Sequence, residues 1–552
     1  MAIHPYDLPP GVDISGFSKS GLSIKFLPKN EMGNGSVAKE RFQVGLGFWW
    51  FLDKSENSTA RNFIFSSVVW LGLVVSVALV LALKFVWPDF LGGVAWLSFG
   101  RLRPFHVNGA LFGWLSMSSL GIMFYILPKL TGARLWSERL GNVTCLLWNT
   151  VIVLSAVSLP FGYTQGREYA EYVLPLDLMT MLCFTLLIYN AFKTVALRKE
   201  KAMYVSLWYF LATLVWAPII FLVGNNFMMD WTGLGGRGVV PGVNDAMLNW
   251  WYGHNVIGMW FSTLGLGIFY YFLPVLTKNP LYSHRLSMIG FWTLAFFYVW
   301  NGQHHLVYGP GPDWLESVAI TFSVLMVIPV FAVVYNFFKT AHGKWHLIFD
   351  SSYEALPVRF LMVGGLAYLL TCTQGALINA PRTTNAYFHF TYWTVGHAHL
   401  AFLGSFSFIN MAAIYYIIPR ITGIQMNHRL ANWHFGLFTA GIIVFLGILH
   451  TAGIIQGAMW MAKIEEIDFL TDKVILRPAV EFIDVVRALH PFYFTVMIGA
   501  GIMVSGIMIF VFNVIRTVYA TPYTVPQTAP SNAPADTVKR DEKQRGREGT
   551  RE

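Results

Sequence analysis

Long apolar segments constrain the fold of this chain more than any other feature of its sequence. Twelve such runs, each about 20 residues or longer, alternate with mostly short polar loops. Inside a bilayer every backbone polar group needs a hydrogen-bond partner within its own segment, so runs of this kind cross as helices. They lie at about 62–86, 105–127, 140–159, 176–195, 205–223, 248–273, 286–307, 314–338, 358–378, 392–418, 434–461 and 491–515. The sequence predicts an all-α integral membrane protein with twelve transmembrane helices.

The charged residues predict how these helices are oriented. Only 12% of the residues are charged and the formal net charge is +9. The basic residues gather in the loops after even-numbered runs, for example Lys129, Arg134 and Arg420. This is the pattern of cytoplasmic loops, so both termini are predicted to be cytoplasmic and the positive charge does not indicate a nucleic-acid partner. Three cysteines in separate apolar runs and the absence of a CxxCH motif argue against disulfides and against a c-type haem on this chain.

Three regions follow from composition. Residues 1–60 form a polar N-terminal extension without a cleavable signal peptide, and residues 61–518 hold the twelve helices. Residues 519–552 are rich in Pro, Ala and charge and are predicted to be a disordered cytoplasmic tail. We see no second soluble domain and no internal repeat.

The motif TVGHAH, residues 394–399, places His397 and His399 in one apolar run. Two residues correspond to about 200° of helical rotation, so the two imidazoles face opposite sides and serve different partners. Such side chains are costly in hydrocarbon unless paired, and imidazole is a common ligand of haem iron and copper. A single histidine of this kind is more often a packed core residue, but four others predicted at the same outer depth favour ligation: His106, His254, His304 and His305.

The spacing of the other histidines indicates a metal site. His304 and His305 are adjacent, so both reach one ion only near a helix end or a distorted turn. His254, from the preceding run, would supply a third nitrogen, and three neutral imidazoles with an open position suit copper or zinc. Tyr298 lies seven residues before His305, on the same helical face. It is either a donor of a proton and an electron to this site or an aromatic packing residue, and spacing leaves both open.

Several motifs together resemble one family. SFGRLRPFHVNG, NWWYGHNVIG, YVWNGQHHLVY and WTVGHAH closely resemble the catalytic subunit of cbb3-type (C-family) haem-copper cytochrome c oxidases, over about residues 60–520. The resemblance implies the twelve-helix haem-copper oxidase fold. It also implies a terminal respiratory oxidase that reduces O2 to water, takes electrons from cytochrome c through a low-spin haem b, and couples this to proton uptake and pumping.

The same resemblance implies roles for individual residues. His106 and His399 would be the axial ligands of low-spin haem b, and His397 the single ligand of high-spin haem b3. His254, His304 and His305 would hold copper B, and Tyr298 would be covalently joined to His254. Arg103 would pair with a haem propionate, the alternative being an ordinary surface charge. Glu168 and Glu171 would contribute to a calcium site, or are solvated loop charges.

The resemblance further implies a proton path, partner subunits and a location. Tyr270 and Ser287 would belong to a single proton channel. Ser262 and Thr293 are further candidates, although hydroxyls in membrane helices commonly bond to their own backbone. Because the chain has neither a c-type haem motif nor a dicopper thiolate site, it would need membrane-anchored mono- and dihaem cytochrome c subunits. It would lie in the bacterial inner membrane with its metal centres toward the periplasm.

Two residues depart from the family pattern. Gln374, before Gly375, stands where these oxidases usually carry glutamate, and Tyr392 stands where they usually carry aspartate. The loss of two acids near the haem pocket predicts altered proton handling and puts pumping in question, but it does not affect the ligands.

Two other functions are weighed against the oxidase. A nitric oxide reductase has the same twelve helices but holds non-haem iron, which prefers an added carboxylate. Here Asn255, Val256, Ile257 and Gly258 follow His254 without an acid, and Tyr298 is retained, which favours oxygen. A twelve-span secondary transporter with a histidine relay would place its polar groups near the middle of the membrane, whereas these histidines are predicted to lie near the outer side.

Overall fold

The computed structural model describes residues 50–228, 239–468 and 473–519 of the 552-residue chain. In this part of the chain eleven helices are long and apolar enough to cross a membrane, which confirms the all-α membrane class. The remaining predicted crossing, at 286–307, is divided: α9 (His284–Tyr298) ends early and a short 3-10 helix, η6 (Asn301–Leu306), follows it. Most of the predicted N-terminal extension and nearly all of the predicted C-terminal tail lie outside the described residues.

The crossings other than the one that contains α9 agree with the predicted runs to within six residues at each end, apart from α17, which begins nine residues earlier than predicted. Seven of them are built mainly from single α-helices or from closely joined pairs: α1 (Ser58–Val86), α4 (Glu138–Ser158), α5 (Leu174–Ala196), α6 (Val205–Gly224), α10 with α11 (Asp313–Leu325, Val327–Thr340), α16 (His428–Met461) and α17 (Phe482–Tyr519). An eighth, α12 (Leu356–Gln374), continues into a π-helical segment, η8 (Gly375–Asn379).

The other three crossings share one composite design. Each has an α-helix, then a π-helical segment, then a second α-helix: α2 (Phe99–Asn108), η3 (Gly109–Ser116) and α3 (Met117–Thr131); α7 (Val243–Val256), η5 (Ile257–Ser262) and α8 (Thr263–Thr277); α14 (Tyr392–His399), η9 (Leu400–Ser407) and α15 (Phe408–Thr422). They are the most buried crossings, at 94%, 94% and 83% of their apolar windows, against 50% or less for the others. They therefore form the inside of the bundle.

These three crossings correct the expectation that the chain has no internal repeat. The closing helices α3, α8 and α15 each have 15 residues and carry a proline three residues before their last threonine. Each is followed by a residue with positive φ, which ends the helix: Gly132, Lys278 and Gly423. The proline and threonine of this pattern are present in the sequence, and the structure adds the shared order of α-helix, π-helical segment and α-helix and the positive φ at the end.

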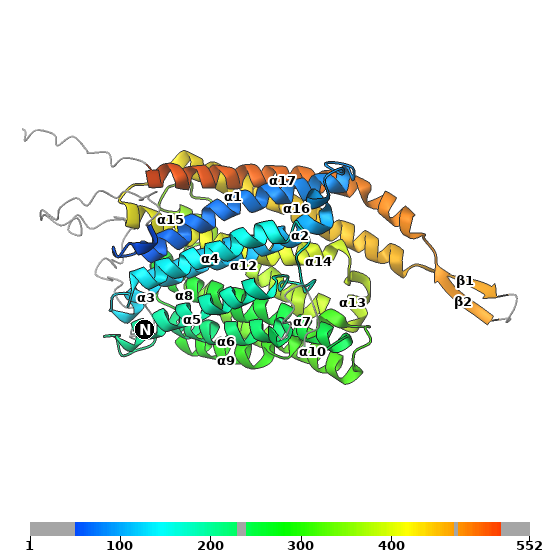
Figure 1. Cartoon of the computed structure of the whole chain (residues 1–552), viewed down its shortest axis with the longest axis horizontal. Helices are drawn as coiled ribbons and strands as arrows, with labels where there is room; N and C mark the ends of the chain where they lie inside the picture. Colours follow the sequence, from blue (N-terminus) through cyan, green and yellow to red (C-terminus); the bar gives the residue numbers. More distant parts are fainter. Residues whose placement is uncertain (1–49, 229–238, 469–472, 520–552) are drawn as a thin grey trace, which may run out of the picture. The chain divides into compact units, whose positions relative to one another are not determined.

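The last two long helices pack beside α1 and are joined by a short hairpin. Figure 1 shows α1, α16 and α17 side by side, in agreement with the packing of α17 against both of the others. Between α16 and α17 the chain forms an antiparallel hairpin, β1 (Lys463–Asp468) and β2 (Lys473–Pro478), which projects past the helices near α13 (Arg382–Phe388) (Figure 1). From the sequence we expected a loop here, without strands.

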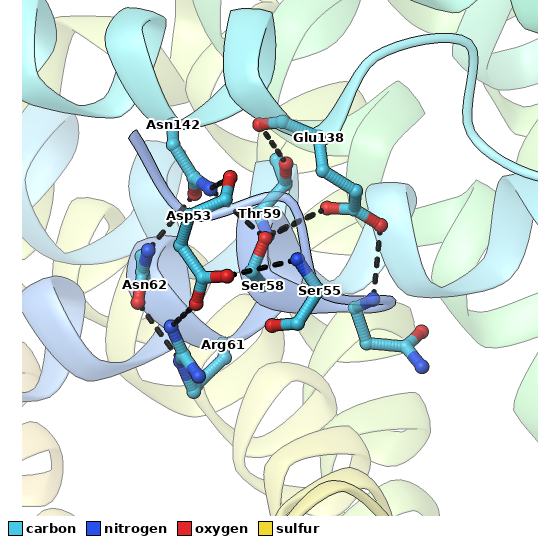
Figure 2. Close-up of polar contacts among 9 residues, drawn as sticks. Asp53, Ser55, Ser58, Thr59, Arg61, Asn62, Glu138 and Asn142 are labelled. Carbon is cyan, nitrogen blue, oxygen red and sulfur yellow. Dashed lines mark hydrogen bonds and ion pairs between the residues drawn. The ribbon is translucent and has the colours of Figure 1, made fainter. Parts of the chain in front are cut away.

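The first turn of α1 is capped by a residue from another helix. Asn57, the residue before α1, has a left-handed backbone conformation, and its side chain does not cap the helix. Glu138, the first residue of α4, accepts hydrogen bonds from the backbone N–H groups of Asn57 at 2.9 Å and Thr59 at 2.8 Å. Figure 2 shows this carboxylate beside the ion pair of Arg61 with Asp53, whose atoms are 2.6 Å apart. One side chain thus satisfies unpaired donors of α1 and fixes α1 against α4.

Replacing Glu138 with alanine is expected to lower the free energy of unfolding by about 1–2 kcal/mol, because two backbone donors lose their acceptor. The measurement is thermal unfolding of the detergent-solubilised protein. Glu56→Ala is the matched control, since it removes a nearby carboxylate whose side chain is exposed. Equal losses in both variants would contradict the capping role.

Candidate metal centre

Three histidines converge at one point of the structure. The ligand atoms of His254, His304 and His305 all lie within 4.8 Å of one another. His254 comes from α7, and the adjacent pair comes from η6. Because α9 ends at Tyr298, the pair sits on a tighter 3-10 turn, and the ring centroids of His304 and His305 are 4.4 Å apart. This is the only group of three or more potential metal-binding side chains found among the described residues.

A glycine allows η6 to approach α7 closely enough for this convergence. A Cβ atom at Gly302 would lie 2.5 Å from Cα of Trp251, which is closer than real side chains come. The neighbouring Trp250 then stacks on the ring of His305, with centroids 4.6 Å apart and planes inclined by 17°. The two helices therefore hold the metal-binding pair by backbone contact as well as by ring stacking.

The hydrogen bonds of His304 define which of its nitrogens is available. The hydroxyl of Ser323, on α10, donates to the carbonyl of Ala319 at 2.6 Å. It therefore accepts from Nδ1–H of His304, which is also 2.6 Å away. Nε2 of His304 is then left with a lone pair, as a metal ligand requires. Among the described residues Nε2 of His254 is likewise buried without a hydrogen-bond partner. This donor set fits a copper or zinc ion.

Tyr298 lies directly against this group. Its ring stacks on that of His254, with centroids 4.3 Å apart and planes inclined by 19°. Gly258, one turn after His254, makes the contact possible, because a Cβ there would lie 2.0 Å from Cε1 of Tyr298. The phenol is thus placed by two different helices at the edge of the three-histidine cluster.

The remaining three histidines border the same cavity, of about 730 Å³, which is lined mainly by apolar side chains. His399 packs against Phe445 of α16, and His397 lies beside Gly375 of η8, so the two rings point to different elements. Nδ1 of His399 donates to the carbonyl of Val395 at 2.8 Å, which leaves Nε2 as the ligand atom. His106, near the end of α2, lines the same cavity as His397 and His399. An apolar cavity bordered by several imidazoles fits haem.

Tyr392 borders the same cavity as the six histidines. Its ring centroid is 5.3 Å from that of Tyr493 on α17 and 6.0 Å from that of Phe85 on α1. Its backbone N–H donates to the side-chain oxygen of Gln456 at 2.9 Å. The residue that replaces an aspartate of the family pattern is therefore part of an aromatic wall.

Arg103 and Glu168, which both border the cavity, form an ion pair. Arg103 binds Glu168 with two hydrogen bonds, of 2.7 and 3.1 Å. Glu171 is 4% exposed and accepts from the amide of Asn108 at 2.8 Å. Burial, reinforced by the charge of Glu168, raises the pKa of Glu171 to about 7. At neutral pH this carboxyl group is therefore close to its midpoint of ionisation.

The predicted proton-path residues are only partly brought together. Ser287 accepts from the amide of Asn336, on α11, at 3.0 Å. The hydroxyl of Tyr270 is buried and has no hydrogen-bond partner among the residues that the structure describes. Ser262 lines the cavity. Thr293 instead donates to the carbonyl of Ile289 on its own helix at 2.6 Å and does not border the cavity.

Sequence reasoning missed several polar residues of this region. Tyr368 and Cys372 of α12 line the same cavity as Tyr298. Ser323 and Asn336 were also not singled out. Each is one hydroxyl, amide or thiol in a long apolar run, and the sequence carries no signal for its partner.

Comparison with known proteins gives a consistent result. The sequence model of the family Cytochrome C and Quinol oxidase polypeptide I matches residues 58–503. The chain is 34% identical over 463 residues to the cbb3-type cytochrome c oxidase subunit CcoN1 of Stutzerimonas stutzeri, covering 83% of this chain and 94% of the relative. It is 32% identical over 446 residues to a bacteroid cytochrome c oxidase subunit 1 homolog of Bradyrhizobium diazoefficiens, covering 80% and 78%.

More distant relatives share the fold. A nitric oxide reductase chain of Stutzerimonas stutzeri is 23% identical over 431 residues, covering 73% of this chain and 84% of that protein. A haem-copper terminal oxidase dimer solved by cryo-electron microscopy matches with a TM-score of 0.66 at 14% identity, over 84% of this chain and 85% of that one. The sequence similarity is thus greater to the cbb3-type oxidase relatives than to the reductase.

Proposed function

This chain belongs to the family of catalytic subunits of cbb3-type haem-copper cytochrome c oxidases, and from that premise we propose which of its residues carry out oxygen reduction. It is a multi-pass membrane subunit of a multi-subunit terminal oxidase in respiratory electron transport. The observation that carries the proposal is the convergence of His254, His304 and His305 beside Tyr298.

We assign copper B to the three converging histidines. Their nitrogens are within reach of one ion, and Ser323 holds His304 in the tautomer that presents Nε2. His106 and His399 would hold low-spin haem b, and His397 would hold high-spin haem b3. When bound, high-spin haem b3 and copper B would pass electrons to O2 and form the place at which it is reduced.

Tyr298 has the position of a proton and electron donor. Its ring lies on that of a proposed copper ligand, in a cavity that also contains His397. A phenol held there can release a proton from its hydroxyl without a large movement. We propose that it is joined covalently to His254, as in the family that it resembles, and the two rings are direct neighbours, with centroids 4.3 Å apart.

We propose that protons reach Tyr298 from the cytoplasmic side through Ser287, Tyr270 and Ser262. Asn336 donates to Ser287, and Tyr368 and Cys372, which line the cavity with Tyr298, would continue the polar path toward it. We leave Thr293 out of the path, because its hydroxyl donates to Ile289 at an exposed position of α9. Electrons from the outer side that meet protons from the inner side store about 2.3 kcal/mol per charge at 100 mV. We propose that pumping adds to this uptake.

At the outer side, Arg103 would hold a haem propionate, in exchange for or together with Glu168. Calcium fits the described residues less well. Both oxygens of Glu168 accept hydrogen bonds from Arg103. Among the residues that the structure describes, Glu171 does not belong to a cluster of three or more side chains that could hold a metal ion. We therefore assign calcium no part in the reaction.

Electrons must come from partners, because the sequence has no c-type haem motif. We propose membrane-anchored mono- and dihaem cytochrome c subunits as these partners. We also propose the bacterial inner membrane as the location, with cytoplasmic termini and the metal centres toward the periplasm, in agreement with the basic loops after the even-numbered apolar runs of the sequence.

Metal analysis of the purified complex, combined with turnover of O2 and of nitric oxide, tests the proposal against the reductase alternative. We expect about one copper per high-spin haem, because three imidazoles without a carboxylate suit copper, and we expect rapid oxygen consumption. Iron in place of copper, with nitric oxide turned over and oxygen used poorly, would overturn it. Tyr298 would then be a packing residue in a reductase.

A further inference from the structure

Two polar side chains behind His397 have no role in the function proposed so far. Gln374 ends α12, and its Oε1 atom lies 3.2 Å from Nδ1 of His397. The same oxygen lies 3.3 Å from Nε2 of His450, on α16. The amide of Gln374 therefore stands between two imidazoles, one of which faces the haem cavity.

The position of His450 is fixed by its surroundings. Its Nδ1 donates to the carbonyl of Leu446 at 2.7 Å, and its ring meets the edge of Trp393 with centroids 4.6 Å apart. Gly396 makes room for it, because a Cβ there would lie 2.9 Å from Cε1 of His450. Since Gly396 directly precedes His397, α14 and α16 bring the second imidazole to the side of the first.

The hydrogen-bonding capacity of the three groups decides how they connect. Nδ1 of His397 donates when Nε2 faces the iron, so it needs an acceptor. Nε2 of a neutral His450 carries a lone pair, because its Nδ1–H is used by Leu446, so it needs a donor. A neutral amide side chain offers both an acceptor and a donor. In the structure Oε1 of Gln374 faces both rings, and a turn about the soft terminal torsion of the amide would bring an N–H to His450 while Oε1 stays near His397. A carboxylate offers only acceptors.

We propose that Gln374 and His450 are positioning residues for His397, joined to it in a neutral hydrogen-bonded relay that ends on the carbonyl of Leu446. This inference rests on the proposed role of His397 as the haem b3 ligand. A neutral acceptor draws the Nδ1 proton less strongly than a carboxylate does, so His397 keeps more imidazole and less imidazolate character. The iron then receives less electron density, and the relay raises the midpoint potential of the high-spin haem relative to a chain with glutamate at position 374.

The test uses the intact oxidase complex and two readouts other than activity: the iron–histidine stretching frequency of the ferrous high-spin haem and its midpoint potential. Gln374→Glu is expected to raise the frequency and lower the potential. Gln374→Met is expected to shift both the opposite way. His450→Phe removes the acceptor of the amide N–H and should shift both in the direction of Gln374→Met, by a smaller amount, because the remaining amide is less polarised.

Thr371→Val is the matched control. Thr371 lies one turn before Gln374 and borders the cavity, but its hydroxyl donates to Ala367 on its own helix at 2.8 Å. It should leave both readouts unchanged. Variants of Gln374 and His450 that bind both haems with an unchanged frequency and potential would overturn the relay alone. A wild-type complex without a five-coordinate, histidine-bound haem would instead overturn the proposed function.

Discussion

Replacing His304 with alanine is expected to abolish oxygen reduction while the low-spin haem stays in place. Loss of a residue that only orients a metal ligand typically costs about 10–100-fold in metal affinity or activity, and loss of the ligand itself costs more. We therefore expect at least about a hundredfold fall in oxygen consumption and copper below one atom per complex. The measurements are oxygen uptake, metal analysis and the optical spectrum of low-spin haem, which is assigned to His106 and His399 in another part of the cavity.

Ser323→Ala keeps the proposed copper ligand His304 but removes the hydroxyl that orients it. Ser323 accepts from Nδ1 of His304 and is itself 2% exposed. Its loss frees the imidazole to turn or to change tautomer, so we expect an intermediate fall of about 10–100-fold. If His304→Ala kept its full copper content, the assignment of the metal site to these histidines would be wrong.

Gly258→Ala is expected to have a comparable effect through Tyr298. The added methyl group would lie 2.0 Å from Cε1 and 2.2 Å from Cζ of the phenol, so the ring must leave its present position beside His254. A displacement of about 1 Å at a reacting group can cost about a hundredfold in rate. We expect oxygen reduction to fall by about that factor, with copper and both haems retained, as measured by oxygen uptake, metal analysis and optical spectra.

Two further variants show whether a loss of rate in Gly258→Ala comes from the phenol hydroxyl of Tyr298. Tyr298→Phe keeps the ring and removes the hydroxyl, so a similar loss of rate would show that the phenol O–H is what Gly258→Ala displaces. Gly447→Ala in α16 is the matched control, because no atom lies within 4 Å of its added Cβ. Full activity in Gly258→Ala would mean that the position of Tyr298 is unimportant.

Some properties of this protein are encoded locally. The membrane crossings follow from apolar length, which is a property of each segment alone. The histidines were identifiable for the same reason, since an imidazole is conspicuous in an apolar run wherever that run lies in the fold. The adjacency of His304 and His305 also predicted a distorted turn, and the structure has a 3-10 helix there.

Contacts by which one helix fixes a side chain of another could not be predicted from the sequence. Ser323 selects the tautomer of His304 from a different helix, and Gly258 permits the approach of Tyr298. The repeat of three crossings and the hairpin after α16 were likewise missed. Such features depend on where π-helical and 3-10 segments depart from α-helical geometry, and one sequence does not specify those departures.

His450 illustrates the division most clearly. In the sequence it is a single histidine in an apolar run, for which packing is the ordinary interpretation. In the structure Gly396 lets it reach the amide of Gln374, which also contacts His397. The membrane helices, the candidate ligands and the replacement of an acid by Gln374 could all be identified from residue type and local spacing. Which of these groups meet could be learned only from the folded chain, because hydrogen bonds act over a few ångströms and the partners come from separate helices.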